Sequence, residues 1–171
     1  MKLLSDTDVR LRALEPADVD ALYAWENLSE LWNTSATLAP YSRRNFQKYI
    51  ETYDADPFGA GELRLMVECG SRPVGFVDLY GVEVLHRRAY IGILIAPDMQ
   101  RRGYARRALA LLERYCSRHL QLHQLLALVP VYNDASLSLF ASCGYTRVAL
   151  LPDFIAVNRG FADAALMRKA L

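Results

Sequence analysis

The chain has 171 residues and a mass of 19.3 kDa, which suits one domain with a full hydrophobic core, and we expect a single domain over residues 1–171. A formal net charge of +1 excludes a broad basic surface for nucleic acid, and no apolar run approaches the roughly 20 residues that cross a membrane. Because the start of the chain also lacks the apolar core of a signal peptide, we expect a cytoplasmic protein with no nucleic-acid or membrane partner.

The first third of the chain predicts one strand followed by two helices. The strand covers Val9 to Leu14, and Pro16 then lies in the first turn of a helix, where its missing N–H group costs little. A second helix is predicted from Arg43 to Thr52, because Phe46, Tyr49 and Ile50 recur at helical spacing.

Three strands should follow as an antiparallel meander, over Leu63–Glu68, Pro73–Tyr80 and Ala89–Ala96. The third is almost continuously apolar, which indicates a central strand that is buried on both faces. Gly92 within it allows another backbone or a ligand to approach closely.

The last part of the chain predicts a helix from Tyr104 to His119, with one apolar stripe and one charged face. A strand over Gln124–Val129, a helix over Asp134–Cys143 and two strands over Tyr145–Leu151 and Ala164–Met167 complete the pattern. The element order is typical of an α/β fold and shows no internal repeat.

A candidate anion site lies between the buried third strand and the helix that starts near Tyr104. Gly103 at the helix start leaves the first backbone N–H groups free, and the positive end of the helix adds to their attraction for an anion. Arg101 and Arg102 add positive charge at the same place. The segment fits neither a Walker A loop nor GxGxxG, which counts against triphosphate and dinucleotide ligands.

The loop resembles the pyrophosphate-binding motif Q/R-x-x-G-x-G/A of the GNAT N-acetyltransferases, which Gln100, Gly103 and Ala105 match. Downstream, Asn133 before a helix and Gly144-Tyr145 after it resemble a second family motif in the same order. The resemblance extends over roughly residues 8 to 169, and within the family it is nearest to the spermidine/diamine and ribosomal-protein N-terminal branches. It implies the GNAT fold, a mixed central sheet of about seven strands with flanking helices, and acetyl-CoA as cosubstrate.

The same resemblance implies where acetyl-CoA binds. It places the cofactor in a slot where the apolar third strand splits from the strand Gln124–Val129, with N–H groups near Leu94 and Ile95 holding the pantetheine arm. Asn133 is expected to hydrogen-bond that arm or, equally, to cap the following helix. The pyrophosphate would be bound by the loop residues Gln100, Arg101, Arg102, Gly103, Tyr104 and Ala105.

Two catalytic positions of the family are changed in this sequence. A glutamate that often lies before the loop in the polyamine branch is Tyr90 here, and Asp78 on the neighbouring strand is our candidate base because it interrupts an apolar run. A tyrosine that often acts as the acid is Phe140, so Ser136 is the candidate replacement, with helix capping as the alternative. Tyr90 is a further candidate donor, although an aromatic residue there is also compatible with a core position.

The acceptor is predicted to be a primary amine, most simply a polyamine or diamine, bound by Glu26, Glu30 and Tyr41, although these carboxylates also suit a solvated surface. Two alternatives stay open: a protein N-terminal acetyltransferase and a non-catalytic CoA-binding module. The cysteines and histidines lack ligand spacing, so we expect no metal ion. Open sheet edges allow a homodimer.

Overall fold

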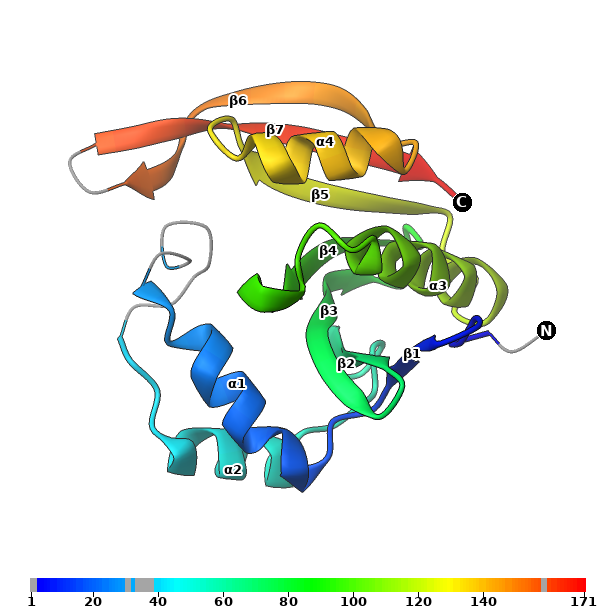
Figure 1. The fold of residues 1–171 in the computed structure, drawn as a ribbon. Helices are drawn as coiled ribbons and strands as arrows, with labels where there is room; N and C mark the ends of the chain where they lie inside the picture. Colours follow the sequence, from blue (N-terminus) through cyan, green and yellow to red (C-terminus); the bar gives the residue numbers. More distant parts are fainter. Residues whose placement is uncertain (1–2, 30–31, 33–38, 158–159) are drawn as a thin grey trace.

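The computed structural model of the protein describes residues 3–29, 32, 39–157 and 160–171 (Figure 1). The strands in this part of the chain are β1 Val9–Arg12, β2 Glu62–Cys69, β3 Arg72–Glu83, β4 Arg88–Ile95, β5 Gln124–Pro130, β6 Thr146–Val157 and β7 Gly160–Ala170. The α-helices are α1 Val19–Glu26, α2 Arg43–Thr52, α3 Tyr104–Arg118 and α4 Asp134–Ser142, and single 3-10 turns cover Pro16–Asp18 and Pro97–Met99. The predicted order of elements is confirmed.

The strands form one mixed sheet in the order β1-β2-β3-β4-β5-β7-β6. Strands β1 to β4 are antiparallel neighbours, as the meander predicted. Strand β4 runs parallel to β5, but the two pair only where Arg88–Tyr90 lies beside Gln124–Leu126. Beyond these residues the two strands, which are fully described, no longer pair, and Figure 1 shows them diverging. The sheet therefore opens between β4 and β5.

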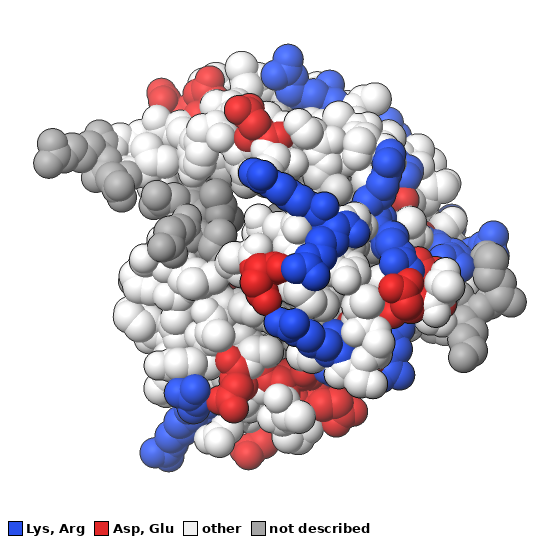
Figure 2. Space-filling view, viewed as in Figure 1, with Lys and Arg blue, Asp and Glu red and all other residues white. Residues whose placement is uncertain are grey.

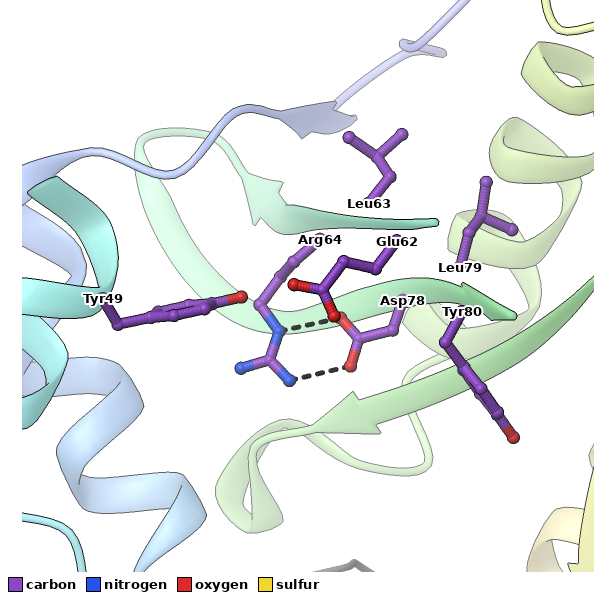
Figure 3. A pocket seen from close by; sticks show the side chains of 7 residues that line it. All are labelled: Tyr49, Glu62, Leu63, Arg64, Asp78, Leu79 and Tyr80. Atoms are coloured by element: carbon purple, nitrogen blue, oxygen red, sulfur yellow. Dashed lines mark hydrogen bonds and ion pairs between the residues drawn. The ribbon is translucent and has the colours of Figure 1, made fainter. Parts of the chain in front are cut away.

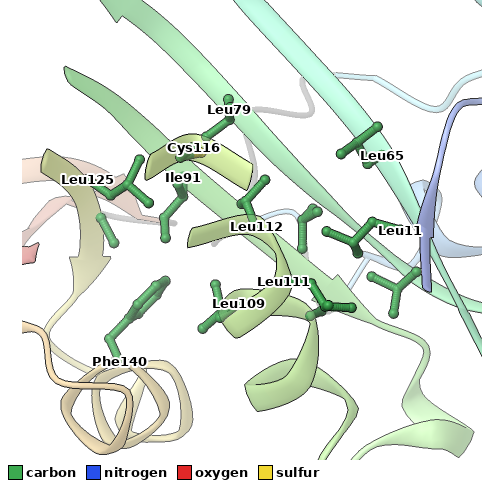
Figure 4. Close-up of a cluster of buried hydrophobic side chains, with 14 of the residues drawn as sticks. Leu11, Leu65, Leu79, Ile91, Leu109, Leu111, Leu112, Cys116, Leu125 and Phe140 are labelled. Carbon is green, nitrogen blue, oxygen red and sulfur yellow. The ribbon is translucent and has the colours of Figure 1, made fainter. Parts of the chain in front are cut away.

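Each face of the sheet packs against its own helices. Helices α3 and α4 cover the main core, in which Leu109 and Leu112 of α3 and Phe140 of α4 lie against strand residues such as Ile91 and Leu125 (Figure 4). On the opposite face, α1 and α2 cover a smaller cluster made of Leu22, Phe46, Met66 and Phe76. Because side chains alternate along a strand, residues two positions from those of the smaller cluster, such as Arg64 beside Met66 and Asp78 beside Phe76, also face α1 and α2.

Gly75 lets β3 approach the end of β4 closely. A Cβ atom at Gly75 would lie 2.1 Å from the carbonyl oxygen of Leu94 and 2.9 Å from the Cα of Ile95. No side chain fits there, so glycine keeps the end of β4 against β3 while β4 leaves β5.

The last two strands are longer than the predicted Tyr145–Leu151 and Ala164–Met167, and β6 continues through Pro152. The register between β6 and β7 shifts between Leu151 and Ile155, and Asp153 there has a left-handed backbone with φ +50°. This bulge absorbs the proline, which cannot donate a hydrogen bond to a regular strand pair. The resulting hairpin exposes Val148, Leu150, Phe154 and Phe161.

A buried carboxylate joins the edge strand β1 to β2. Glu68 is 4% exposed, and its two oxygens accept hydrogen bonds from the Nε atoms of Arg10 and Arg12, each at 2.6 Å. Arg12 also donates two hydrogen bonds of 2.7 Å to Asp18 at the start of α1. The hydrogen bond from Arg10, ahead of that from Arg12, holds the pKa of Glu68 below its ordinary value of 4.5.

We expect Glu68→Gln to lower the free energy of unfolding at neutral pH by on the order of 3 kcal/mol, because it removes the buried carboxylate that pairs with both Arg10 and Arg12 and leaves Arg12 with Asp18 alone. In the wild type, the stabilisation from Glu68 is complete above its ordinary pKa of 4.5 and should be lost as the pH falls through its lower folded pKa. Urea denaturation followed by circular dichroism measures both effects. Glu62→Gln, an exposed carboxylate on the same strand, is the control and should stay within about 0.5 kcal/mol of the wild type; equal losses in the two variants would contradict this role.

Candidate active site

From Ile91 to Ile95, the edge of β4 that faces β5 pairs with no strand in the described part of the chain. Up to Tyr90 this edge pairs with β5, and on its other side β4 pairs with β3 throughout, so the open groups lie inside the sheet. Backbone N–H and C=O groups in such a position require partners. An extended ligand with amide groups, such as the pantetheine arm of CoA, fits this edge, which includes the predicted positions Leu94 and Ile95.

The loop before α3 has the geometry of an anion site. Gly103 caps α3 with φ +82°, and Arg101 also has a left-handed backbone, with φ +61°. The first hydrogen bond of the helix runs from the N–H of Arg107 to the carbonyl of Gly103 at 3.2 Å. The N–H groups before Arg107 therefore have no partner within the helix. A strained backbone at a non-glycine residue is typical of functional sites.

Two side chains fix the shape of this loop. The side chain of Gln100 donates to the carbonyl of Ile95 at 3.0 Å, and Arg102 donates to the carbonyl of Asp98 at 3.0 Å. Gln100 therefore ties the loop to the end of β4, which explains a glutamine at this motif position without direct contact to an anion. Figure 2 shows Lys and Arg side chains gathered over the part of the molecule where α3 lies in Figure 1.

Helix α4 starts beside the end of β5. The Oδ1 atom of Asn133 accepts the backbone N–H of Ser136 at 3.1 Å, so the capping alternative for Asn133 is confirmed, and its pantetheine contact stays a prediction. Ser136 is half-buried in the first turn. Phe140 is 3% exposed and packs edge-on against Tyr145, with ring centroids 5.1 Å apart. The position of the family's tyrosine is therefore occupied by a core residue.

The polar residues on the α1/α2 face form an ion network around Arg64. The Nε and Nη2 atoms of Arg64 each donate to one oxygen of Asp78 at 2.8 Å, as Figure 3 shows, and Nη1 donates to Glu26. Arg64 and Asp78 are direct partners in the β2–β3 register. The predicted base thus faces this side of the sheet, with both carboxylate oxygens hydrogen-bonded to a guanidinium.

Two cavities adjoin this network. The inner one, of about 160 Å³, is lined by Tyr49, Glu62, Leu63, Arg64, Asp78, Leu79 and Tyr80 (Figure 3). The outer one, of about 330 Å³, is lined by Glu26, Tyr41, Asn45, Phe46, Tyr49, Glu62 and Arg64. Their shared residues make them parts of one acidic and aromatic cleft, which includes the predicted acceptor residues Glu26 and Tyr41. Glu30 lies outside the described residues.

Tyr90 is the last residue of β4 that pairs with β5, and it contacts Tyr80 in the wall of the cleft. Its ring stacks on that of Tyr80, with centroids 5.5 Å apart, and burial raises the pKa of Tyr80. Next along the same face of β4 is Gly92, where a Cβ atom would come within 3.7 Å of the Asp78 Cβ. Gly92 therefore leaves room between the cleft and the open edge of β4. Tyr90 lies on the cleft face and outside the core clusters, and its catalytic role stays a prediction.

The sequence analysis gave no role to Arg64, Tyr49 or Tyr80, which line the cleft. Arg64 and Asp78 are polar interruptions on adjacent strands, and pairing those strands in register would have found their contact. Within the described residues, no group of three or more His, Cys, Asp or Glu side chains could hold a metal ion, and no helix is long and apolar enough to span a membrane.

The family model of the Acetyltransferase (GNAT) domain matches residues 8–146. The chain belongs to the GNAT acetyltransferase family. This GNAT protein is 26% identical to the spermidine N(1)-acetyltransferase of Escherichia coli (strain K12) over 162 residues, which cover 93% of this chain and 84% of the relative. It is 27% identical to the spermidine N(1)-acetyltransferase of Vibrio cholerae over 163 residues, which cover 95% of this chain and 92% of that one.

Solved structures agree with the GNAT assignment. The crystal structure of the Vibrio cholerae spermidine N-acetyltransferase in complex with CoA and spermine has a TM-score of 0.83 to this chain at 25% identity, covering 96% of each chain. A dodecameric structure of spermidine N-acetyltransferase from Vibrio cholerae has a TM-score of 0.78 at 26% identity, covering 96% of this chain and 95% of that one. The predicted GNAT fold is confirmed, and this GNAT protein is an acetyl-CoA-dependent N-acetyltransferase.

Gly103→Ala should weaken CoA binding by about tenfold, because a side chain at φ +82° strains the loop whose N–H groups would bind pyrophosphate. No atom lies within 4 Å of the added Cβ, so strain and not a clash causes the effect. Gly61→Ala is the matched control, with φ +73° and equally open space. Both variants should lose roughly 1 kcal/mol of stability, and isothermal titration calorimetry should find weaker CoA binding in Gly103→Ala alone. The same CoA affinity in both variants would argue against the loop as the pyrophosphate site.

Proposed function

We propose that this GNAT protein transfers the acetyl group of acetyl-CoA to a primary amine of a small diamine or polyamine. The observation that carries the proposal is the cleft on the α1/α2 face, whose two cavities are lined by carboxylates and tyrosines. Carboxylates attract ammonium groups, and tyrosine rings stabilise cations above their faces. The spermidine N(1)-acetyltransferases among the relatives support the same substrate class.

The two sides of the sheet opening would bring the reactants together. Backbone N–H groups near Leu94 and Ile95 would hold the thioester end of acetyl-CoA and stabilise negative charge on the acetyl oxygen as it forms. The pyrophosphate would lie at the loop from Gln100 to Ala105. The amine would reach the thioester from the cleft past Gly92, so that both substrates are bound together when the nitrogen attacks.

The reaction forms a C–N bond and breaks the C–S bond, and it requires a neutral amine. An alkylammonium has a pKa near 10, so one proton must leave the amine before or during attack. The side chain of Glu62 has no hydrogen bond or ion pair to any other described residue, and Glu62 lines both cavities, so it is the carboxylate best placed to accept a proton from the incoming ammonium. Asp78, held by Arg64, would act mainly through its charge.

The leaving thiolate needs less help than the amine. A thiol of pKa about 8 to 9 is a fair leaving group at neutral pH. The reaction can therefore proceed in a chain that has Phe140, which cannot donate a proton, at the position of the family's tyrosine. Ser136 lies in the first turn of α4 beside the end of β5 and would donate a hydrogen bond to the sulfur, with solvent supplying the proton.

Self-association is also part of the proposal, because β6 is an open edge strand and a relative forms a dodecamer.

The direct test incubates the purified protein with acetyl-CoA and 1,4-diaminobutane, spermidine, spermine, aminoglycosides and short peptides, and follows the release of CoA. We expect turnover with the aliphatic amines, because they match an acidic and aromatic cleft. Turnover on peptides alone would reassign the protein to N-terminal acetylation. Binding of CoA without release for every amine would contradict the proposal.

Ser136→Ala should lower kcat by about tenfold with little change in the KM of the amine, because it removes a hydrogen bond to the departing sulfur and no contact to the acceptor. Ser138→Ala, an exposed serine on the same helix, is the control and should leave both constants unchanged. Steady-state kinetics at saturating acetyl-CoA distinguishes the two variants. If Ser136→Ala keeps the full kcat, the serine only completes the helix cap.

A further inference from the structure

Arg64 is a cation inside a cleft proposed to bind cations. It lines both the inner and the outer cavity, together with Tyr49 and Glu62. Its side chain is 16% exposed, so it is part of the wall and does not extend into solvent. A positive charge fixed at this place must affect which amines can bind.

The contacts of Arg64 hold it firmly in one position. All three guanidinium nitrogens of Arg64 donate hydrogen bonds: Nε and Nη2 to Asp78, and Nη1 to Glu26. Its guanidinium also lies over the ring of Phe76, 4.1 Å from the centroid. Planar paired contacts of this kind, combined with a cation–π contact, are stronger than a single exposed ion pair. An incoming ammonium would have to break all of them to take its place.

Arg64 also sets the charge of the cleft. Among the described residues, the cavity walls carry Glu26, Glu62 and Asp78, and these three carboxylates against the one guanidinium of Arg64 leave a net charge of −2. Two of the carboxylates already have a cationic partner in Arg64. Glu62 is the wall carboxylate with no ion pair to another described residue. The wall charge thus balances a dication, and further ammonium groups would lie near an arginine that repels them.

We propose that Arg64 is a specificity-determining residue: a built-in cation that occupies the subsite between Glu26 and Asp78 and directs the enzyme to short diamines over triamines and tetraamines. The inference rests on the proposed function, because it assumes that the cleft binds the amine acceptor. It differs from that function in naming the charge and length of the preferred substrate.

The experiment compares kcat/KM for 1,4-diaminobutane, spermidine and spermine at low ionic strength in the wild type and in Arg64→Met, Arg64→Gln and Arg64→Lys. The wild type should prefer the diamine. Loss of the charge in Arg64→Met should raise the spermine-to-diamine ratio by about tenfold or more, because Glu26 and Asp78 become free to bind a second and third ammonium. Arg64→Lys keeps the charge and should stay within about threefold of the wild-type ratio.

The ratio between substrates separates specificity from a structural defect, since a misfolded or distorted site loses activity on every amine alike. Arg64→Gln keeps an amide donor for Asp78 and gives the same test if Arg64→Met does not fold. A wild type that prefers spermine, or an Arg64→Met or Arg64→Gln ratio equal to the wild-type ratio, overturns the inference and leaves the proposed function standing. A wild type that acetylates none of the three amines overturns both.

Discussion

The architecture depends on how little β4 and β5 pair: three residues on each strand, followed by divergence. Strands β1 to β4 and strands β5 to β7 share only this short junction, so further contacts must hold them together, and residues of the helices make these contacts. Arg106 of α3 donates to the carbonyl of Ser142 at the end of α4 at 2.7 Å, and Lys169 of β7 bonds both Glu113 of α3 and the carbonyl of Cys143. Positive groups at the C-terminal end of a helix satisfy its open carbonyls and stabilise its dipole. The opening in the sheet is therefore held by the same residues that orient α4.

The alternation of side chains along β2, β3 and β4 divides the work of the protein between two faces. Residues on one face pack against α3 and make the main core, whereas Arg64 and Asp78 lie on the other face and line the cleft, beside the smaller cluster that includes Met66 and Phe76. The backbone of β4 at the opening is the place where we propose that the cofactor binds. A shift of one residue in register would move Arg64 and Asp78 into the main core and its apolar residues to the face of the cleft.

The fold and the order of its elements could be predicted from the sequence, because hydrophobic periodicity and turn residues such as Gly103 are local signals. The ion network was not predicted, since a contact between Arg64 and Asp78 depends on the register of two strands and not on spacing along the chain. Asn133 had two equal interpretations that only geometry could separate, and the cap is the one found. The length of β6 was missed because the bulge around Asp153 accommodates a proline that normally ends a strand.

The hairpin of β6 and β7 has a consequence for handling the protein. Strand β6 ends the sheet, and it exposes Val148, Leu150 and Phe154 along an edge whose backbone can still accept another strand. Natural edges are usually guarded by charged gatekeepers or prolines against such addition. On β6 these charged residues and prolines are Arg147, Pro152 and Asp153. Replacing an exposed apolar residue between them, such as Leu150, with lysine is therefore the change that would most directly improve solubility at high concentration without touching the cleft or the anion loop.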